Sequence, residues 1–252
     1  MVETTSRDGT SIAYERTGTG PALIVVDAAG NFRGFRPMRA PVSHLAERFT
    51  VYVYDRRGRG ASTDTVPYAV EREVEDLAAL IDEAGGSAYV YGMSSGGLLA
   101  IHSAARGLPI RRMALFEPPL QLREDPSGFT TELSALVEAG RRRDAVDLFH
   151  RSIGVPEEML PELPMEALES VAHTLVYDCT LSDTMTRAVL ERVAVPTLIL
   201  DSAGSGDELA GMAATAAAAI PHAVRRSLPG GWHGVTDDVL APVLAGFLLD
   251  GQ

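Results

Sequence analysis

Hydrophobic residues along this chain form short runs that alternate with stretches of helical periodicity. Residues 22–26 read ALIVV, a continuous apolar run of the kind found in strands that are covered on both faces. Two more strands are expected upstream, because an Asp-Gly turn separates them and a Gly-Pro break follows the second. Runs rich in Val, Ile, Leu and Tyr predict further strands at residues 49–55, 88–92, 110–119, 195–202 and 222–231.

Apolar residues at helical spacing occupy the intervals between these strands. Residues 68–85 join two strands, and residues 240–249 follow the last one. Strands that alternate with helices imply right-handed crossovers and helices on both faces of a parallel sheet. The sequence therefore predicts an α/β fold built on a mostly parallel, doubly wound sheet.

The alternation stops once, between residues 120 and 190. That segment contains no convincing strand and reads as several short helices separated by prolines. The helices are expected at residues 127–140, 143–154 and 165–178. We interpret the segment as a helical cap inserted after the sixth strand. The predicted domains are thus a core of residues 1–119 and 191–252 and a cap, or lid, of residues 120–190.

Composition narrows the range of partners. The 252 residues fit one large domain, the net charge is −12, and the chain contains no lysine. This acidity argues against nucleic acid or an anionic membrane as a partner. The first ten residues lack an apolar signal region, and no apolar run reaches the ~18 residues of a membrane span, so we expect a cytoplasmic location. These features do not define an oligomeric state.

Cysteine and histidine spacing predicts neither a disulfide nor a metal site. Cys179 is the only cysteine, so no internal disulfide can form. The six histidines do not combine with it at the spacing of a zinc finger. We therefore expect no metal and no cofactor.

The segment SAYVYGMSSGGLLA, residues 87–100, is the strongest candidate for a catalytic motif. It places G-x-S-x-G between a predicted strand and an apolar helix, and only the register Gly92–Gly96 fits. A sharp strand-to-helix turn projects a serine oxygen free of the backbone, as a nucleophile requires. Ser94 is then the nucleophile, and the backbone N–H of Ser95 contributes to an oxyanion hole. The alternative is a helix start in which serine is an N-cap and the glycines allow close packing.

His233 is the candidate general base. It lies in LPGGWHGVTDD, a glycine-rich loop between the last strand and the last helix, and it follows the serine in chain order. His102 lies two turns beyond Ser94 on the same helix and is expected to point away. His173 belongs to the cap, where it either lines the pocket or packs between helices.

The acid that orients the imidazole is ambiguous from the residues alone. Asp201 lies too close to the last residues of its strand, whereas Asp207 follows in a loop that brings it within reach. Glu117 ends the strand next to the nucleophile strand and faces the same edge. Glu117 alternatively anchors the start of the cap through backbone N–H groups.

Four segments together resemble the α/β-hydrolase superfamily, and the resemblance covers nearly the whole chain outside the cap. They are the opening DGTSIAYERTGTGPALIVVD, the elbow YGMSSGG, the histidine loop PGGWHG, and VYDRRGRGAS at residues 53–62. The last is similar to the family's D-x-R-G-x-G-x-S segment at Asp55, Arg57, Gly58, Gly60 and Ser62. The resemblance implies an α/β-hydrolase fold.

Two departures from the family pattern bear on the site. Asp27-Ala28 replaces the usual His-Gly after the third strand, and the same register implies that Ala29 donates the second oxyanion N–H. The family's usual acid falls near Ser205, which is no acid. Some members, including haloalkane dehalogenases, take their acid after the earlier strand. That likeness favours Glu117, with Asp207 as the alternative acid.

These residues predict a serine hydrolase that acts on a carboxylic ester or lactone through an acyl-enzyme. The dehalogenase and epoxide-hydrolase branches use an aspartate nucleophile, whereas this elbow carries a serine. The alternative is a cofactor-free lyase or cyclase, or a ligand-binding member of the same fold.

The expected substrate is an apolar small molecule of medium size, because the cap is rich in apolar and aromatic residues. Those residues are Phe129, Leu136, Leu148, Phe149, Met159, Leu175 and Tyr177, about half of which are expected to form the cap's own packing. The residues expected to line the substrate pocket are Asp27, Met93, Trp232, His173 and Tyr177. Asp27 fits a turn carboxylate as well as a group that faces the substrate.

Overall fold

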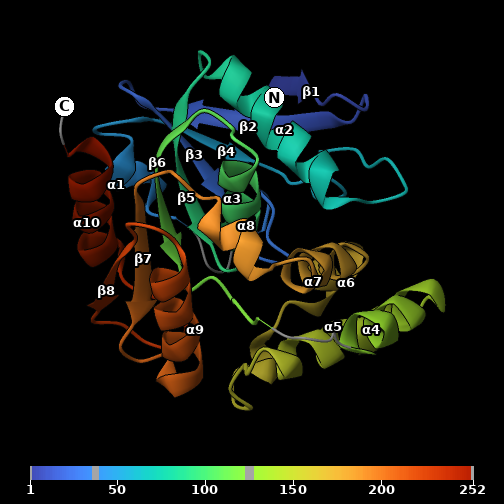
Figure 1. Cartoon of the computed structure of the whole chain (residues 1–252). Helices are drawn as coiled ribbons and strands as arrows, with labels where there is room; N and C mark the ends of the chain where they lie inside the picture. Colours follow the sequence, from blue (N-terminus) through green and yellow to red (C-terminus); the bar gives the residue numbers. More distant parts are fainter. Residues whose placement is uncertain (1, 36–39, 123–127, 251–252) are drawn as a thin grey trace.

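A single eight-stranded sheet forms the centre of the molecule (Figure 1). The computed structural model describes residues 2–35, 40–122 and 128–250, and the strand order is β1-β2-β4-β3-β5-β6-β7-β8. Strands β1 to β8 span Val2–Thr5, Ser11–Thr17, Ala22–Val26, Thr50–Tyr54, Ala88–Met93, Ile110–Phe116, Thr197–Ser202 and Val224–Leu228. β1 and β2 pair antiparallel with their neighbours, and β3 to β8 are parallel. The predicted mostly parallel sheet is confirmed.

Helices cover both faces of the sheet. Successive side chains of a strand point to opposite faces, and in the buried strands both sets are apolar. Ile24 and Val26 of β3 belong to the hydrophobic cluster beneath α2, α3 and α9. Leu23 and Val25 belong to the cluster beneath α1 and α10. These helices span Val42–Leu45 (α1), Val70–Glu83 (α2), Ser95–Ala105 (α3), Gly206–Ala219 (α9) and Asp237–Leu249 (α10). The sheet is therefore doubly wound, as predicted.

All the regular secondary structure described between β6 and β7 is helical. It comprises α4 (Gly128–Glu138), α5 (Arg142–Ser152), a 3₁₀ turn (Leu160–Glu162), α6 (Met165–Ser170), α7 (Thr174–Asp183) and α8 (Arg187–Glu191). Figure 1 shows α4 to α7 grouped together beside the sheet. Leu133, Val146 and Leu168 form a separate hydrophobic cluster there, whereas Leu190 of α8 belongs to the sheet core.

One predicted cap helix differs from the structure. The helix expected at residues 165–178 is divided into α6 and α7, because α6 ends at Ser170 and α7 starts at Thr174. The apolar periodicity continues through the turn, so the break carries no signal in the hydrophobic pattern. Within the described ranges, no helix is both long enough and apolar enough to cross a lipid bilayer.

Candidate active site

Ser94 occupies the sharp turn between β5 and α3. Its φ of 50° lies in the left-handed region, which residues other than glycine rarely adopt. Its N–H donates to the carbonyl of Phe116 at 2.8 Å. Ser94 stands at the N-cap position of α3 but makes no side-chain capping hydrogen bond. The hydroxyl is therefore not used as a helix cap, which was the structural alternative for this motif.

The glycines on either side of Ser94 are required by close backbone contacts. A Cβ atom on Gly92 would lie 2.7 Å from the Cα of Gly97. A Cβ atom on Gly96 would lie 2.1 Å from the carbonyl oxygen of Val26, at the end of β3. Helix α3 thus begins in direct contact with two strands, and any side chain at either position would push the turn apart.

Glu117 and His233 form a buried pair at the same edge of the sheet. Glu117 follows β6 and His233 follows β8, and Glu117 Oε2 lies 2.5 Å from His233 Nδ1. The other carboxylate oxygen accepts the backbone N–H of Ser202 at 2.7 Å, so both oxygens of this fully buried carboxylate have partners. The pairing fixes the imidazole ring and leaves Nε2 as the nitrogen available to a second partner.

Backbone strain is concentrated at these residues. Among the described residues other than glycine, positive φ values occur at Ser94, Glu117, His222 and His233. Three of the four are the predicted nucleophile, acid and base. Such conformations cost free energy and persist where the surrounding structure enforces them, which is common at active sites.

Asp207, the alternative acid, lies away from the imidazole. It is an exposed residue in the first turn of α9. The hydroxyl of Ser205 instead accepts the backbone N–H of His233 at 2.9 Å. Asp201 forms an ion pair with Arg225 at 2.7 Å. Of the acids considered from the sequence, the structure brings Glu117 to His233.

A cavity of about 340 Å³ lies between the core and the cap, with Ser94 and His233 in its wall. Trp232 lines it, as predicted. The cap contributes apolar side chains, among them Phe129, Phe149, Ile153, Met159, Leu163 and Leu168. Leu136, Leu148 and Leu175 pack within the cap's own hydrophobic cluster instead. No arginine lines the cavity among the residues that the structure describes, and the chain has no lysine.

The two predicted oxyanion donors lie in the wall of this cavity. Ala29 follows β3 and Ser95 is the first residue of α3. An N–H at the first position of a helix has no partner within the helix, so the Ser95 N–H is free for an outside acceptor. The carboxyl ends of β3 and β5 are adjacent in the sheet, which brings the two segments together.

Two of the predicted pocket residues, Asp27 and Met93, do not line this cavity. The side chain of Asp27 is buried, with 1% exposure of the residue. Met93 belongs to the sheet core and lines a second, smaller cavity together with Trp232, His233 and Met159 of the cap.

His173 and Tyr177 also lie outside the lining of this cavity. The Tyr177 hydroxyl donates to Asp64 at 2.8 Å, and His173 Nε2 lies 3.7 Å from the same carboxylate. The two residues are one helical turn apart, so they share the face of α7 that meets the core loop. The cavity lining takes its residues from the adjacent face, with Asp178 and Ser182.

Cys179 lines the cavity but does not compete as a nucleophile. Burial raises the pKa of its thiol to about 12, and the thiolate is the reactive form.

Within the described part of the chain, no group of three or more His, Cys, Asp or Glu residues is placed to hold a metal ion.

Sequence reasoning missed a set of buried charged residues beside the oxyanion segments. Arg56 and Arg59 in the loop after β4 meet Asp178 of α7 at 2.7 Å each. The run of arginines was visible in the sequence, but their partner lies about 120 positions further on. Only the docking of α7 on the core brings the two together.

The sheet order, the serine turn after β5 and the histidine loop after β8 define the class of the protein as an α/β-hydrolase fold with a helical cap. The predicted fold is thereby confirmed. The chain belongs to the alpha/beta hydrolase family, whose model matches residues 24–244.

Known relatives agree with this assignment. The crystal structure of an alpha/beta hydrolase from Sphaerobacter thermophilus is 44% identical, covers 98% of this chain and 99% of that chain, and superposes with a TM-score of 0.89. A pimeloyl-[acyl-carrier protein] methyl ester esterase of Xanthomonas campestris is 30% identical over 236 residues, 86% of this chain and 89% of that protein. An uncharacterized hydrolase of Bacillus subtilis is 31% identical over 102 residues, 39% of this chain and 37% of that protein.

Proposed function

We propose that the protein is a serine esterase or lactonase that works through an acyl-enzyme on Ser94. The observation that carries the proposal is the buried Glu117–His233 pair, whose His233 lies with Ser94 in the wall of the cavity. A hydroxyl, an imidazole and a carboxylate that orients the imidazole are the parts that nucleophilic acyl transfer requires.

The proposed reaction has two halves. His233 takes the proton of Ser94 Oγ as that oxygen attacks the substrate carbonyl, and the N–H groups of Ala29 and Ser95 bind the oxyanion. Each such donor stabilises the transition state by about 3 kcal/mol. The imidazolium then protonates the leaving alcohol, and His233 activates a water molecule that releases the acid. Glu117 holds the ring and stabilises its charge throughout.

A neutral, apolar acyl group of medium size is the proposed substrate. The cavity of about 340 Å³ is walled largely by apolar cap side chains. Its charged lining residues in the described chain are the acids Asp178 and Asp183, and no cation faces it there to bind a carboxylate. A relative over most of the chain is named as a methyl ester esterase, which supports ester hydrolysis as the chemistry.

Hydrolysis of short p-nitrophenyl esters tests the proposal. Ser94→Ala should lower kcat at least ~10⁴-fold, because it removes the attacking oxygen. Esterase activity retained in that variant would exclude the acyl-enzyme. A lyase, a cyclase or a ligand-binding member of the fold would show no Ser94-dependent hydrolysis in the wild type. The position of Glu117 against His233 weakens this alternative, because it supplies an orienting acid although the family's usual acid position near Ser205 has none.

A further inference from the structure

The loop that follows β4 carries three arginines whose side chains are removed from solvent. Arg56, Arg57 and Arg59 have side-chain exposures of 0%, 0% and 1%. Buried guanidinium groups are retained only where carboxylates or carbonyls satisfy them. Arg57 is held by Asp76 and Asp8, on the side away from the cavity. The partners of the other two lie at the candidate active site.

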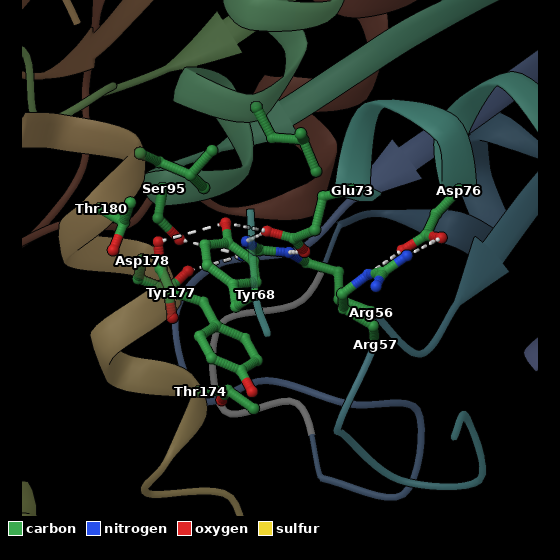
Figure 2. A network of polar contacts seen from close by, with 12 residues as sticks. Arg56, Arg57, Tyr68, Glu73, Asp76, Ser95, Thr174, Tyr177, Asp178 and Thr180 are labelled. Carbon is green, nitrogen blue, oxygen red and sulfur yellow. Dashed lines mark hydrogen bonds and ion pairs between the residues drawn. The ribbon is translucent and has the colours of Figure 1, made fainter. Parts of the chain in front are cut away.

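Arg56 connects α2, α3 and α7 through one guanidinium group (Figure 2). Its Nε and one terminal nitrogen donate to the two carboxylate oxygens of Glu73, at 2.8 Å each. The other terminal nitrogen lies 2.7 Å from Asp178 Oδ1 and 3.2 Å from the hydroxyl of Ser95. Arg56 therefore holds the residue that begins α3.

Arg59 connects α7 to the segment after β3. One terminal nitrogen donates to Asp178 Oδ2 at 2.7 Å, and the other donates to the carbonyl of Ala28 at 3.0 Å. The same carbonyl also accepts the N–H of Asn31 at 3.2 Å. The two oxygens of Asp178 are thus divided between Arg56 and Arg59.

The carbonyl of Ala28 and the N–H of Ala29 belong to one peptide group. A trans peptide is planar, and its N–H points opposite to its carbonyl. A donor that fixes the carbonyl direction therefore fixes the N–H direction as well. A cationic donor on the carbonyl also polarises the group and strengthens the N–H as a donor.

We propose that Arg59, held in place by Asp178 of the cap, is a positioning residue that orients and polarises the 28–29 peptide as an oxyanion donor. This inference rests on the proposed function, because it presumes that the Ala29 N–H binds the oxyanion. It makes the oxyanion hole depend on the docking of α7, although α7 is remote from β3 in sequence. Arg59 itself touches no reacting atom.

Asp178 is ionised at neutral pH and able to hold both arginines. Burial raises the pKa of its carboxyl, but Arg59 and Arg56 lower it by more, and a hydrogen bond from Ser95 lowers it further. The net pKa lies below the usual value for aspartate. Two cations, Arg56 and Arg59, are balanced by two anions, Glu73 and Asp178, so the buried group is neutral as a whole.

The proposal is tested by measuring how Arg59→Met changes the binding of two inhibitors that occupy the same pocket. An alkyl trifluoromethyl ketone adds to Ser94 and forms an oxyanion, whereas the corresponding secondary alcohol binds without one. We expect kcat to fall about 10- to 100-fold with KM within about 3-fold, since loss of a whole donor costs roughly 10²- to 10³-fold. The Ki of the ketone should rise in the same proportion, and the Ki of the alcohol should change by less than about 2-fold.

Tyr177→Phe is the matched control. It removes the hydroxyl that donates to Asp64 at the other attachment of α7, and that hydroxyl contacts neither oxyanion segment. A variant that only loosens the cap should lower the thermal midpoint while the ratio of ketone to alcohol Ki stays at the wild-type value. Arg59→Met should change that ratio.

The double variant Arg59→Met/Asp178→Asn provides a second test if Arg59→Met does not fold. It removes one cation and one anion, so Arg56 and Glu73 remain as a neutral pair. We expect its kcat to match that of Arg59→Met, because Asp178 acts on the 28–29 peptide through Arg59, and both oxygens of Glu73 still hold Arg56. A folded variant with wild-type kcat, or equal weakening of ketone and alcohol, would overturn the positioning role. Hydrolysis that persists in Ser94→Ala would overturn the proposed function first, and this inference with it.

Discussion

At the scale of single residues, the site depends on the orientation of one imidazole ring. Glu117 holds His233 Nδ1, and its second oxygen is held by the N–H of Ser202. A carboxylate fixed at both oxygens cannot rotate away from the ring. Ser94, Glu117 and His233 also each have a positive φ, a conformation that persists because the surrounding structure enforces it.

Glu117→Gln should lower kcat by about 10³- to 10⁴-fold, because an amide cannot stabilise the imidazolium and favours the wrong tautomer. Asp207→Asn should leave kcat within about 2-fold of the wild type, since Asp207 is exposed on α9. Steady-state kinetics on a short p-nitrophenyl ester measures both variants. The reverse ranking would make Asp207 the orienting acid.

The sequence alone predicted some residues of the site and left others undecided. Ser94 and His233 were placed by local motifs, and the structure brings both to one cavity. The acid required the resemblance, because Glu117 and Asp207 both follow strands of the sheet and their spacing does not decide between them. His173 and Tyr177 do not line the cavity, because the docking of α7 decides which of its faces meets the cavity, and one residue changes the direction of a helical side chain by about 100°.

At the scale of elements, α7 joins the cap to the core through polar and aromatic contacts. Tyr68 stacks on Tyr177 with ring centroids 3.9 Å apart, and its hydroxyl donates to Glu73 at 2.9 Å (Figure 2). His102 Nε2 lies 3.0 Å from the carbonyl oxygen of Leu181. Hydrophobic periodicity shows that a helix exists here but not what it meets, because these contacts are made by residues outside the apolar pattern.

The Asp178 contacts should make the stability of the protein sensitive to acid. The pKa of Asp178 is lowered in the folded state from an ordinary value of 3.8, so its stabilisation is present above that value and is lost as the pH falls below it. Asp178→Asn, which resembles the protonated residue, should lower the free energy of unfolding by about 3 kcal/mol at pH 7.

Urea unfolding of both proteins from pH 7 to pH 3 measures this effect. The difference in free energy between wild type and Asp178→Asn should shrink as the pH falls through 4 and below. A difference that stays constant over this range would show that Asp178 is not an ionised partner of the two arginines.

At the scale of the whole molecule, an acidic chain encloses a cavity that no cationic side chain faces among the described residues. The net charge is −12, and the described lining of the cavity includes Asp178 and Asp183. The alternation of strands and helices predicted nearly the whole sheet, because each buried strand leaves a continuous apolar run. The lining of the cavity could not be predicted in this way, because its walls come from cap and core segments and no local pattern encodes their relative placement.

Substrate charge should therefore decide turnover. The p-nitrophenyl ester of hexanoic acid and the mono-p-nitrophenyl ester of adipic acid have acyl chains of equal length, but the second ends in a carboxylate. We expect kcat/KM to be about 10- to 100-fold higher for the neutral ester, because the described lining offers no cation to pair with a buried carboxylate. Equal values, or a preference for the adipate ester, would contradict the proposed substrate class.

The most direct test of the central claim is covalent labelling of Ser94 by a fluorophosphonate, followed by intact-protein mass spectrometry and peptide mapping. The wild type should gain one phosphonyl group on the peptide that contains Ser94, and Ser94→Ala should gain none. Prior incubation with the trifluoromethyl ketone should slow the labelling. An active wild type that stays unlabelled, or a label that persists in Ser94→Ala, would contradict the acyl-enzyme mechanism.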